Sequence, residues 1–227
     1  FAQRQLFKKP LEQVLRDEDF IQVVGEIPAL AETATTPALA YTAGALLSDG
    51  CIQLSDTKGS VTFIQKATPE KADFIAAVEQ SFFKAFGVPF AYMRERTTVG
   101  ELKGREIRGT VEDRICFRKA PADRLMHIRE NLVSWILSLD RTALLHFVAG
   151  YVDGDGTYAE ESSAVRLQIS ISGKRPHFVQ GLALACLRLG IVPQITSNRE
   201  NVNLQIAEKV EDILAFTQRV HAETPTR

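Results

Sequence analysis

Two aspartates, each placed after an apolar segment and before a glycine, are the residues of this sequence best suited to do chemistry. The segments read YTAGALLSDG at 41–50 and FVAGYVDGDG at 147–156. Both contain an Ala-Gly pair, then mostly apolar residues, then Asp-Gly, and Asp49 and Asp155 lie 106 residues apart, as the two Ala-Gly pairs do. A single Asp-Gly after a helix is usually a turn. Two copies in matching context at one offset indicate an internal repeat.

The chemistry that this repeat predicts depends on a metal ion. If the small residues Gly44 and Gly150 let two helices pack closely, Asp49 and Asp155 lie side by side at the helix ends. The glycine after each Asp can take the left-handed conformation that closes a helix. Two carboxylates at the negative ends of helix dipoles repel each other unless a cation joins them. Such oxygen ligands suit Mg²⁺, which in phosphodiester hydrolysis activates water and stabilises the leaving oxygen.

Each half of the chain contains the elements needed to position its aspartate. Apolar residues recur at helical spacing in some segments, and polar and apolar residues alternate in others. In the first half we expect helices at 37–48, 69–86 and 121–138, and strands at 51–56, 61–66, 90–98 and 105–118. In the second half we expect helices at 141–154, 175–189 and 209–221, and strands at 157–160, 164–171, 193–198 and 201–207.

This order predicts an α+β fold of two pseudo-symmetric αββαββα repeats, with antiparallel sheets and the two motif helices packed together at the centre. We expect the first repeat to cover 37–139, the second to cover 140–227, and residues 1–36 to form an N-terminal extension. Asp153 has Leu47 as its counterpart in the first motif. We therefore leave Asp153 out of the expected metal site.

The charge of the chain is balanced overall but uneven along the sequence. A formal net charge of −1 gives no whole-chain sign of a nucleic-acid binder. Residues 91–129, however, hold ten Lys or Arg against six Asp or Glu, which form either a basic face or an ordinary solvated surface. No segment approaches the roughly 20 apolar residues of a membrane span, and the first residues do not resemble a secretion signal. We expect an intracellular protein, in the cytoplasm of a prokaryote or in an organelle, with no membrane partner.

The cysteines point away from a disulfide framework or a zinc site. Cys51, Cys116 and Cys186 lie far apart and form no CxxC pair. The four histidines show no metal-ligand spacing. We expect buried, reduced thiols, with Cys51 a buried strand residue.

The two segments resemble the LAGLIDADG motif of homing endonucleases. VAGYVDGDG is a near-complete match, whereas TAGALLSDG departs at its opening Leu and at the usual first acidic position. Both keep the Asp-Gly. The resemblance covers about residues 37–221 and implies the single-chain form with two motifs, in which saddle-shaped sheets lie along the major groove of DNA.

The activity implied by the resemblance is that of a site-specific double-stranded DNA endonuclease. It implies hydrolysis of phosphodiester bonds that leaves staggered ends at a long target, by a monomer with an internal pseudo-twofold axis. The implied cofactor is Mg²⁺, with Mn²⁺ as a substitute and Ca²⁺ bound without turnover.

The resemblance also implies which residues form the catalytic site. Asp49 and Asp155 are the implied metal ligands, with the backbone carbonyls of Ser48 and Gly154 nearby. A polar and basic pair on the strand after the first motif, here Gln65 and Lys66, would orient water or stabilise charge on the scissile phosphate.

The second half has no Gln-Lys pair at the matching stretch, which reads LQISISGKR. Ser170, Ser172 and Lys174 are the alternatives for this role, and we select Lys174 as the catalytic candidate. The competing interpretation of Lys66 and Lys174 is a solvated position at a strand end.

Polar strand residues are the candidates for base recognition, with Arg reading guanine and Asn or Gln reading adenine. Each is also compatible with an ordinary solvated strand position. The candidates are Gln53, Ser55, Thr62, Arg94, Arg96, Arg105, Arg108, Arg166, Gln168, Asn198, Asn201, Asn203 and Gln205.

Other functions are compatible with the same fold. An RNA-splicing maturase or a non-cleaving DNA-binding regulator would be signalled by loss of the two acids, and both acids are present. The endonuclease part of an intein is a second alternative. A complete intein is not expected, because the chain begins with Phe1 and ends in HAETPTR, without a splicing nucleophile or His-Asn. An unrelated small-molecule enzyme would need a constellation of residues that the sequence does not display.

Overall fold

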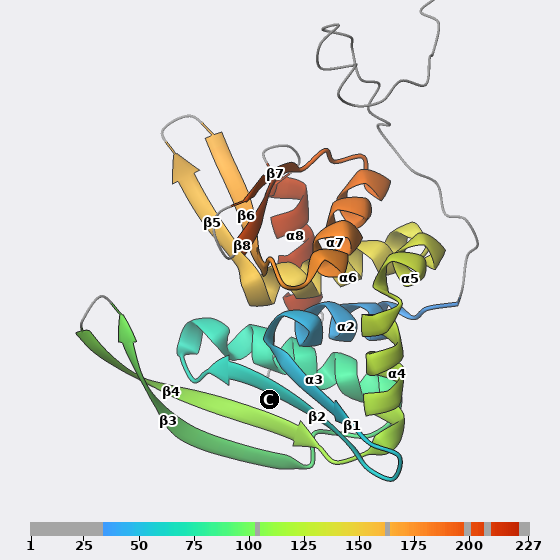
Figure 1. The fold of residues 1–227 in the computed structure, drawn as a ribbon, viewed down its shortest axis with the longest axis vertical. Coiled ribbons are helices and arrows are strands. Elements are labelled where there is room, and N and C mark those ends of the chain that lie inside the picture. Colours follow the sequence, from blue (N-terminus) through green and yellow to red (C-terminus); the bar gives the residue numbers. More distant parts are fainter. Residues whose placement is uncertain (1–33, 103–104, 162–163, 198–200, 207–209, 223–227) are drawn as a thin grey trace, which may run out of the picture.

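The structure, a computed structural model, describes residues 34–102, 105–161, 164–197, 201–206 and 210–222 (Figure 1). Most of the expected N-terminal extension therefore lies outside the described residues. The first half contains α2 (Pro37–Asp49), β1 (Gly50–Leu54), β2 (Gly59–Lys66), the 3-10 turn η1 (Pro69–Lys71), α3 (Ala72–Phe86), β3 (Tyr92–Leu102), β4 (Arg105–Cys116), α4 (Lys119–Glu130) and α5 (Leu132–Ser138). The second half contains α6 (Arg141–Asp155), β5 (Gly156–Glu161), β6 (Ala164–Ser172), α7 (Pro176–Arg188), β7 (Gln194–Ser197), β8 (Asn201–Ile206) and α8 (Val210–Ala222).

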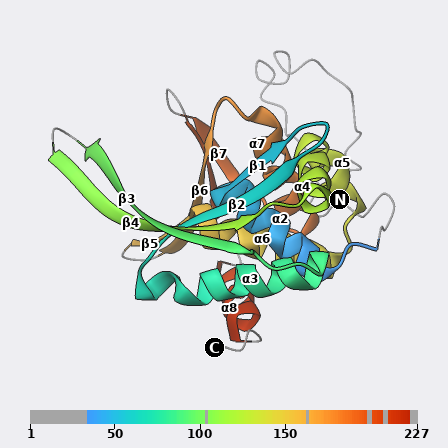
Figure 2. The same cartoon turned by 90° about the horizontal axis from the view of Figure 1, so that it is seen from below.

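Each half forms one four-stranded antiparallel sheet, ordered β1-β2-β4-β3 in the first half and β5-β6-β8-β7 in the second. Figure 1 shows the two sheets on the same side of the molecule, with α2 and α6 between the halves. The sheets are curved, and Figure 2 shows the β3–β4 hairpin reaching well beyond the helices. The expected α+β repeat architecture is confirmed.

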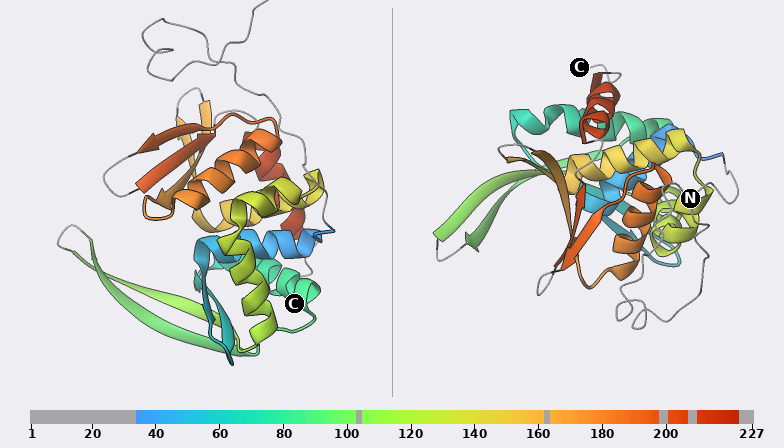
Figure 3. Two further views of the ribbon diagram at one scale, coloured as in Figure 1. Left: turned by 45° about the vertical axis from the view of Figure 1, so that its right-hand side comes forward. Right: turned by 90° about the horizontal axis from the view of Figure 1, so that it is seen from above.

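The two motif helices pack backbone to backbone at the centre of the molecule (Figure 3). A Cβ atom on Gly44 would lie 2.2 Å from the Phe147 carbonyl oxygen, and one on Gly150 would lie 2.2 Å from the Tyr41 carbonyl oxygen. Only glycine fits at either position, because no side-chain atom can come so close to backbone. The reciprocal contacts give the pseudo-twofold axis its position.

The starts of the motif helices follow from their capping residues. Thr36 accepts a hydrogen bond from the Leu39 amide at 3.2 Å ahead of Pro37, and Asp140 accepts one from the Ala143 amide at 2.7 Å. Such caps satisfy amides that have no partner within the helix.

The ends of the motif helices differ from the expectation. Gly50 has φ −114° and Gly156 has φ −72°, so neither is left-handed and each leads directly into a strand. Glycine is needed there because a Cβ atom would lie 2.3 Å from the Leu46 carbonyl oxygen at Gly50 and 2.4 Å from the Val152 carbonyl oxygen at Gly156. The constraint is steric crowding against the preceding turn.

Two further expectations were wrong. The helix expected at 121–138 is broken at Asn131, which has φ −113° and ψ 29°, and so forms the separate helices α4 and α5. Cys51 is exposed, because it neighbours Thr62 on the face of the sheet turned away from the helices, while the adjacent Ile52 is buried. Cys116 and Cys186 are buried free thiols, as expected.

The core lies between the sheets and the helices that cover one face of each sheet. Phe63 of β2 meets Phe74 of α3 edge-on, with ring centroids 5.3 Å apart, and Trp135 packs similarly on Phe147 at 5.4 Å. Within the described residues, none of the helices has the length and apolar character needed to cross a membrane.

Candidate metal centre and nucleic-acid interface

The ends of α2 and α6 meet, which brings the two predicted acids to one place. A Cβ atom on Gly154 would lie 2.0 Å from Ser48 Oγ and 2.8 Å from Asp49 Oδ2. Gly154 is the counterpart of Ser48 at the motif offset of 106 residues, and the Ser48 side chain fills the space that a side chain at 154 would take. The expected carbonyl ligands, Ser48 and Gly154, lie at this junction.

Asp49 is held by a side chain from the neighbouring strand. Gln65 Nε2 donates to Asp49 Oδ2 at 3.0 Å, and Gln65 Oε1 accepts from the Lys66 amide at 2.8 Å, so the Gln65 amide is fixed at both ends. Burial raises the pKa of Asp49 above its ordinary value, although the charge of Lys71 and the hydrogen bond from Gln65 lower it in part. The Gln65 side chain is itself buried.

Asp155 is the more strongly perturbed of the two acids. Burial and then the charge of Asp49 raise the pKa of Asp155, the charges of Arg175 and Lys71 lower it in part, and the net result is a pKa of about 6. The hydroxyl pKa of Tyr151 is raised first by burial and then by the charge of Asp155, and the charge of Arg175 lowers it in part. The charge of Asp49 thus disfavours ionisation of Asp155.

Lys71 and Arg175 are site residues that sequence reasoning missed. Lys71 ends η1 and donates from Nζ to the Asp153 carbonyl oxygen at 3.0 Å. Arg175 precedes α7 at the matching place in the second half. Lys71 lies over the Phe74 ring and Arg175 over the Phe178 ring, at 5.3 and 5.4 Å.

The signal for this pair is present in the sequence. Both cations stand three residues before a phenylalanine at a helix start, in KADF and RPHF. The offset between these copies is 104 residues, two less than between the motifs. Extending the repeat comparison beyond the motifs would have found both.

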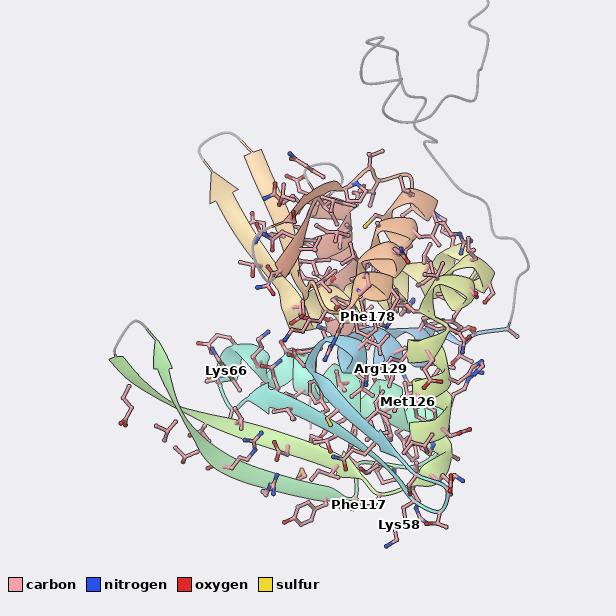
Figure 4. All side chains as sticks on the ribbon, viewed as in Figure 1. Lys58, Lys66, Phe117, Met126, Arg129 and Phe178 are labelled. Carbon is pink, nitrogen blue, oxygen red and sulfur yellow. The ribbon has the colours of Figure 1, made fainter. Side chains whose placement is uncertain are left out.

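The structure does not bring Lys66 and Lys174 to the acids. Gln65 and Lys66 are neighbours on a strand and point to opposite faces, so Lys66 is exposed at the end of β2 (Figure 4). Lys174 is exposed in the turn before α7, where its amide donates to Ser172 Oγ at 3.4 Å. Among the described residues, no hydrogen bond or ion pair joins either ammonium group to Asp49 or Asp155.

Strand register identifies the position equivalent to Gln65 in the second half. Gly50 pairs with Phe63, and Gly156 pairs with Ile169. Gln65 follows Phe63 by two residues, and Ile171 follows Ile169 by two residues. Ile171 is therefore the residue of the second half that is equivalent to Gln65. Ile171 is buried and apolar, so the second acid has no amide donor from this strand position.

Asp153, which was left out of the expected metal site, belongs to a separate polar cluster. Its Oδ2 accepts from Tyr41 Oη at 2.5 Å and lies 2.9 Å from His221 Nε2 of α8. Burial alone would lower the pKa of His221, but the hydrogen bond and charge of Asp153 outweigh burial and raise it. The cluster ties the last helix to both motif helices.

The donor set at the two helix ends fits a hard divalent cation. Among the described residues no group of three or more His, Cys, Asp or Glu side chains gathers in one place, so a site made only of side chains is not formed there. Both carboxyl groups have a pKa raised by burial, and the charge of Asp49 raises that of Asp155 further, so a cation between them would favour their ionised forms. Water or phosphate oxygens would be its remaining ligands. This is the ligand chemistry of Mg²⁺ or Ca²⁺.

The predicted base-contacting residues of the first half divide into groups. Gln53 is exposed on β1, Thr62 lies on β2, and Ser55 lies in the β1–β2 turn, where its Oγ accepts from the Lys58 amide at 3.1 Å. Arg94 and Arg96 lie on β3. Arg105 and Arg108 lie on β4 in register with Leu102 and Val99, and their side chains are outside the described part.

Arg94 and Arg96 are joined through one buried carboxylate. Arg94 Nη2 donates to Asp113 Oδ2 at 2.5 Å, and Arg96 Nε donates to the same oxygen at 3.1 Å. Asp113 is 1% exposed, whereas Arg94 and Arg96 are 52% and 41% exposed. Burial would raise the pKa of Asp113, but the two guanidinium groups outweigh it and hold the pKa below its ordinary range.

The predicted residues of the second half form a network of amides and hydroxyls. Gln205 Nε2 donates to Gln168 Oε1 at 3.3 Å, and Ser170 Oγ donates to Asn203 Oδ1 at 2.7 Å. Asn201 begins β8, opposite Ser172. The Arg166 side chain and all of Asn198 lie outside the described residues.

Comparison with known proteins gives two sequence matches. Residues 142–220 match the model of the LAGLIDADG-like domain family. A "Probable phosphoenolpyruvate synthase" of Methanocaldococcus jannaschii is 29% identical over 223 residues. That match covers 97% of this chain but only 17% of the relative, so the chain spans about a sixth of the length of that protein.

Several solved structures with a similar fold are homing endonucleases. I-WcaI bound to its DNA recognition sequence superposes with a TM-score of 0.54 at 12% identity, covering 82% of each chain. I-DmoI in complex with DNA and Ca superposes with a TM-score of 0.51 at 14% identity, covering 81% of this chain and 88% of that one. I-DmoI in complex with DNA and Mn gives a TM-score of 0.51 at 15% identity, covering 82% and 97%.

Proposed function

Because the chain carries a LAGLIDADG-like domain within a two-domain LAGLIDADG fold, we propose that it is a site-specific endonuclease that cuts double-stranded DNA with divalent metal, Mg²⁺ in particular. The observation that carries the proposal is the meeting of Asp49 and Asp155 at the ends of two helices locked together by Gly44 and Gly150. One acid from each half provides one metal-binding corner for each strand of a duplex.

The roles of the site residues follow from their contacts. Asp49 and Asp155, with the carbonyls of Ser48 and Gly154, would hold the cation, which when bound supplies activation of water and stabilisation of the leaving oxygen. Gln65 fixes the orientation of the Asp49 carboxylate. Lys71 and Arg175 keep positive charge beside the acids, where a scissile phosphate would gather negative charge.

The DNA would lie along the two curved sheets, which open on one side of the molecule. Both acids belong to one chain, so a monomer has a complete site. We infer a long target, because strands from both halves present polar side chains on the same side. Two corners related by a pseudo-twofold axis would cut the two strands at staggered positions.

Enrichment followed by cutting tests this proposal. The full chain is allowed to bind randomised duplex DNA in Ca²⁺ over several rounds, and the enriched DNA is then exposed to Mg²⁺ or to EDTA. Sequence-specific breaks in Mg²⁺ alone are expected. The variants Asp49→Asn and Asp155→Asn should enrich the same sequences and leave them uncut, because each removes a charged ligand while keeping its shape.

Asp123→Asn serves as the matched control, since Asp123 is exposed on α4 and remote from the helix ends. It should bind and cut like the parent protein. Enrichment without cutting by the parent would replace the proposal with a non-cleaving DNA-binding regulator. Cutting retained by the variant that lacks both acids would overturn the two-carboxylate mechanism.

The match to a small part of a longer protein supports a second proposal, on origin. Nearly the whole chain aligns with 17% of a protein named as a synthase. An inserted segment, such as the endonuclease part of an intein, would have this relation to its host. Sequencing the gene on both sides of this segment tests the idea: splicing residues and a continuing host reading frame would support it, and stop codons would overturn it.

A further inference from the structure

The two sheets present faces of different chemistry to the side away from the helices. We call this side of each sheet its outer face. In the first sheet the inner face is marked by Phe63, which packs on α3, so its neighbours Thr62 and Ile64 belong to the outer face. Register places Asp113 beside Ile64 and Arg94 beside Asp113, so the Arg94–Asp113–Arg96 cluster is on the outer face.

In the second sheet the inner face is marked by Ile169 and Leu204, which are fully buried and paired with each other. The alternating residues therefore form the outer face. Its described side chains at the centre of the sheet carry amides and hydroxyls and no formal charge. They are Gln168, Ser170, Gln194, Thr196, Asn203 and Gln205.

Hydrogen bonds hold the side-chain amides of the second outer face in place but do not use all of their donors and acceptors. Gln205 uses one amide proton to bind Gln168 Oε1. A carboxamide has a second amide proton and an acceptor oxygen, which together match the N6 donor and N7 acceptor of adenine. Asn203 accepts from Ser170 and keeps its two amide protons. This surface complements A·T pairs in the major groove.

The first outer face is organised for a different base. The Asp113 carboxylate fixes two guanidinium groups that remain about half exposed. A guanidinium that is already oriented loses little side-chain entropy on binding, and its free N–H groups match the O6 and N7 acceptors of guanine. Asp113 contacts no base in this arrangement and acts as a positioning residue.

Resting on the proposed endonuclease function, we propose that the target is chemically asymmetric. The half contacted by the second sheet carries adenines at the positions met by Gln168, Asn203 and Gln205. The half contacted by the first sheet carries guanine at the positions met by Arg94 and Arg96. Nearly symmetric helices therefore sit above two unlike recognition surfaces.

The test compares sequence preferences of the full chain and its variants, by sequencing duplexes enriched from a randomised pool in Ca²⁺. Gln205→Ala should lose about 5- to 150-fold of the discrimination for adenine at one or two positions of one half-site. Arg94→Ala should lose a similar factor for guanine in the other half-site. The matched controls, Gln218→Ala on α8 and Arg124→Ala on α4, are exposed and lie off both outer faces, so they should keep the parent preferences.

Asp113→Asn separates positioning from a general structural role. It should weaken the guanine preference of the first half-site and leave the adenine preference of the second unchanged, whereas general loss of folding would weaken both. Enrichment with the same base preference in both half-sites, or with preferences unaffected by Gln205→Ala and Arg94→Ala, overturns the asymmetric target alone. Failure of the parent chain to enrich any sequence counts against the proposed function itself.

Discussion

Gln65 Nε2 donates to Asp49 Oδ2 over 3.0 Å, and this contact has no partner in the second half, where Ile171 occupies the matching strand position. The two acids therefore have different surroundings. Asp49 is oriented by a buried amide, whereas Asp155 is influenced at longer range by the charges of Arg175 and Lys71. A DNA duplex bound across the ends of α2 and α6 would therefore meet two metal-binding positions with different surroundings.

Because Gln65 contacts only Asp49 of the two acids, we predict that replacing Gln65 slows the cutting of one DNA strand more than that of the other. Gln65→Met keeps the length of the side chain but removes the donor, so Asp49 loses its fixed orientation. We expect cutting of one strand to slow by about 10-fold or more, because a hydrogen bond to a charged group is worth about 1.5–3 kcal/mol. Supercoiled plasmid carrying the target should accumulate as nicked circles. Ile171→Val is the matched control, and equal slowing of both strands would contradict the prediction.

Proton competition should govern metal binding. Because the metal-free pKa of Asp155 is raised to about 6, most of this carboxyl is protonated at pH 5 and ionised at pH 7.5. A cation needs the ionised form, so the affinity for Ca²⁺ should rise about 10-fold between these pH values. Calorimetric titration with Ca²⁺ measures this. Asp155→Asn should remove most of the rise, and a pH-independent affinity of the parent would show that Asp155 is not a ligand.

The Asp153–His221 contact predicts stability that depends on pH. The pKa of His221 is raised in the folded protein, so the contact stabilises fully below the unfolded pKa near 6.5 and fades as pH rises through the folded pKa. His221→Gln should therefore lower the free energy of unfolding by about 1 kcal/mol at pH 6 and by less at pH 8.5. Urea unfolding in EDTA gives both values. His127→Gln, exposed on α4, should be neutral at both, and an equal loss for His221→Gln at the two pH values would disprove the charged contact.

Close packing of the motif helices predicts a severe effect of a single methyl group. Gly150→Ala would place Cβ 2.2 Å from the Tyr41 carbonyl oxygen, so the helices must separate. We expect a loss of about 2–4 kcal/mol in the free energy of unfolding, despite the better helix propensity of alanine. Gly100→Ala is the control, because a Cβ atom on Gly100 of β3 would meet nothing within 4 Å. Similar stability of the two variants would show that the helix pair can adjust.

The parts of the fold that follow a local pattern could be predicted from the sequence. The repeat of Ala-Gly and Asp-Gly at one offset identified both motif helices and both acids, because the same packing requirement acts twice. The helix break at Asn131 was missed, since the apolar spacing continues through it from Leu125 to Trp135. The backbone there turns without any Gly or Pro to mark the position.

The site residues that were missed depend on contacts distant in sequence. Lys71 and Arg175 lie just before α3 and α7, and their offset differs from the motif offset because the connection from strand to helix is two residues longer after β2 than after β6. Cys51 was predicted to be buried but is exposed. It lies at the start of a short strand directly after a helix, where no alternation of polar and apolar residues shows which face of the sheet a side chain is on. The binding of Arg94 and Arg96 to one carboxylate, that of Asp113, could be predicted only by knowing that β3 pairs with β4.

The glycine contacts between α2 and α6 make the separation of the two acids a property of main-chain atoms. Gly44 and Gly150 leave no side chain between the helices, so there is nothing at the crossing to repack. Substitutions on the sheets can accumulate without changing how far Asp49 lies from Asp155. If the chain is the endonuclease proposed above, new sequence preferences can therefore evolve on the two sheets while the spacing between its two metal-binding acids is inherited unchanged.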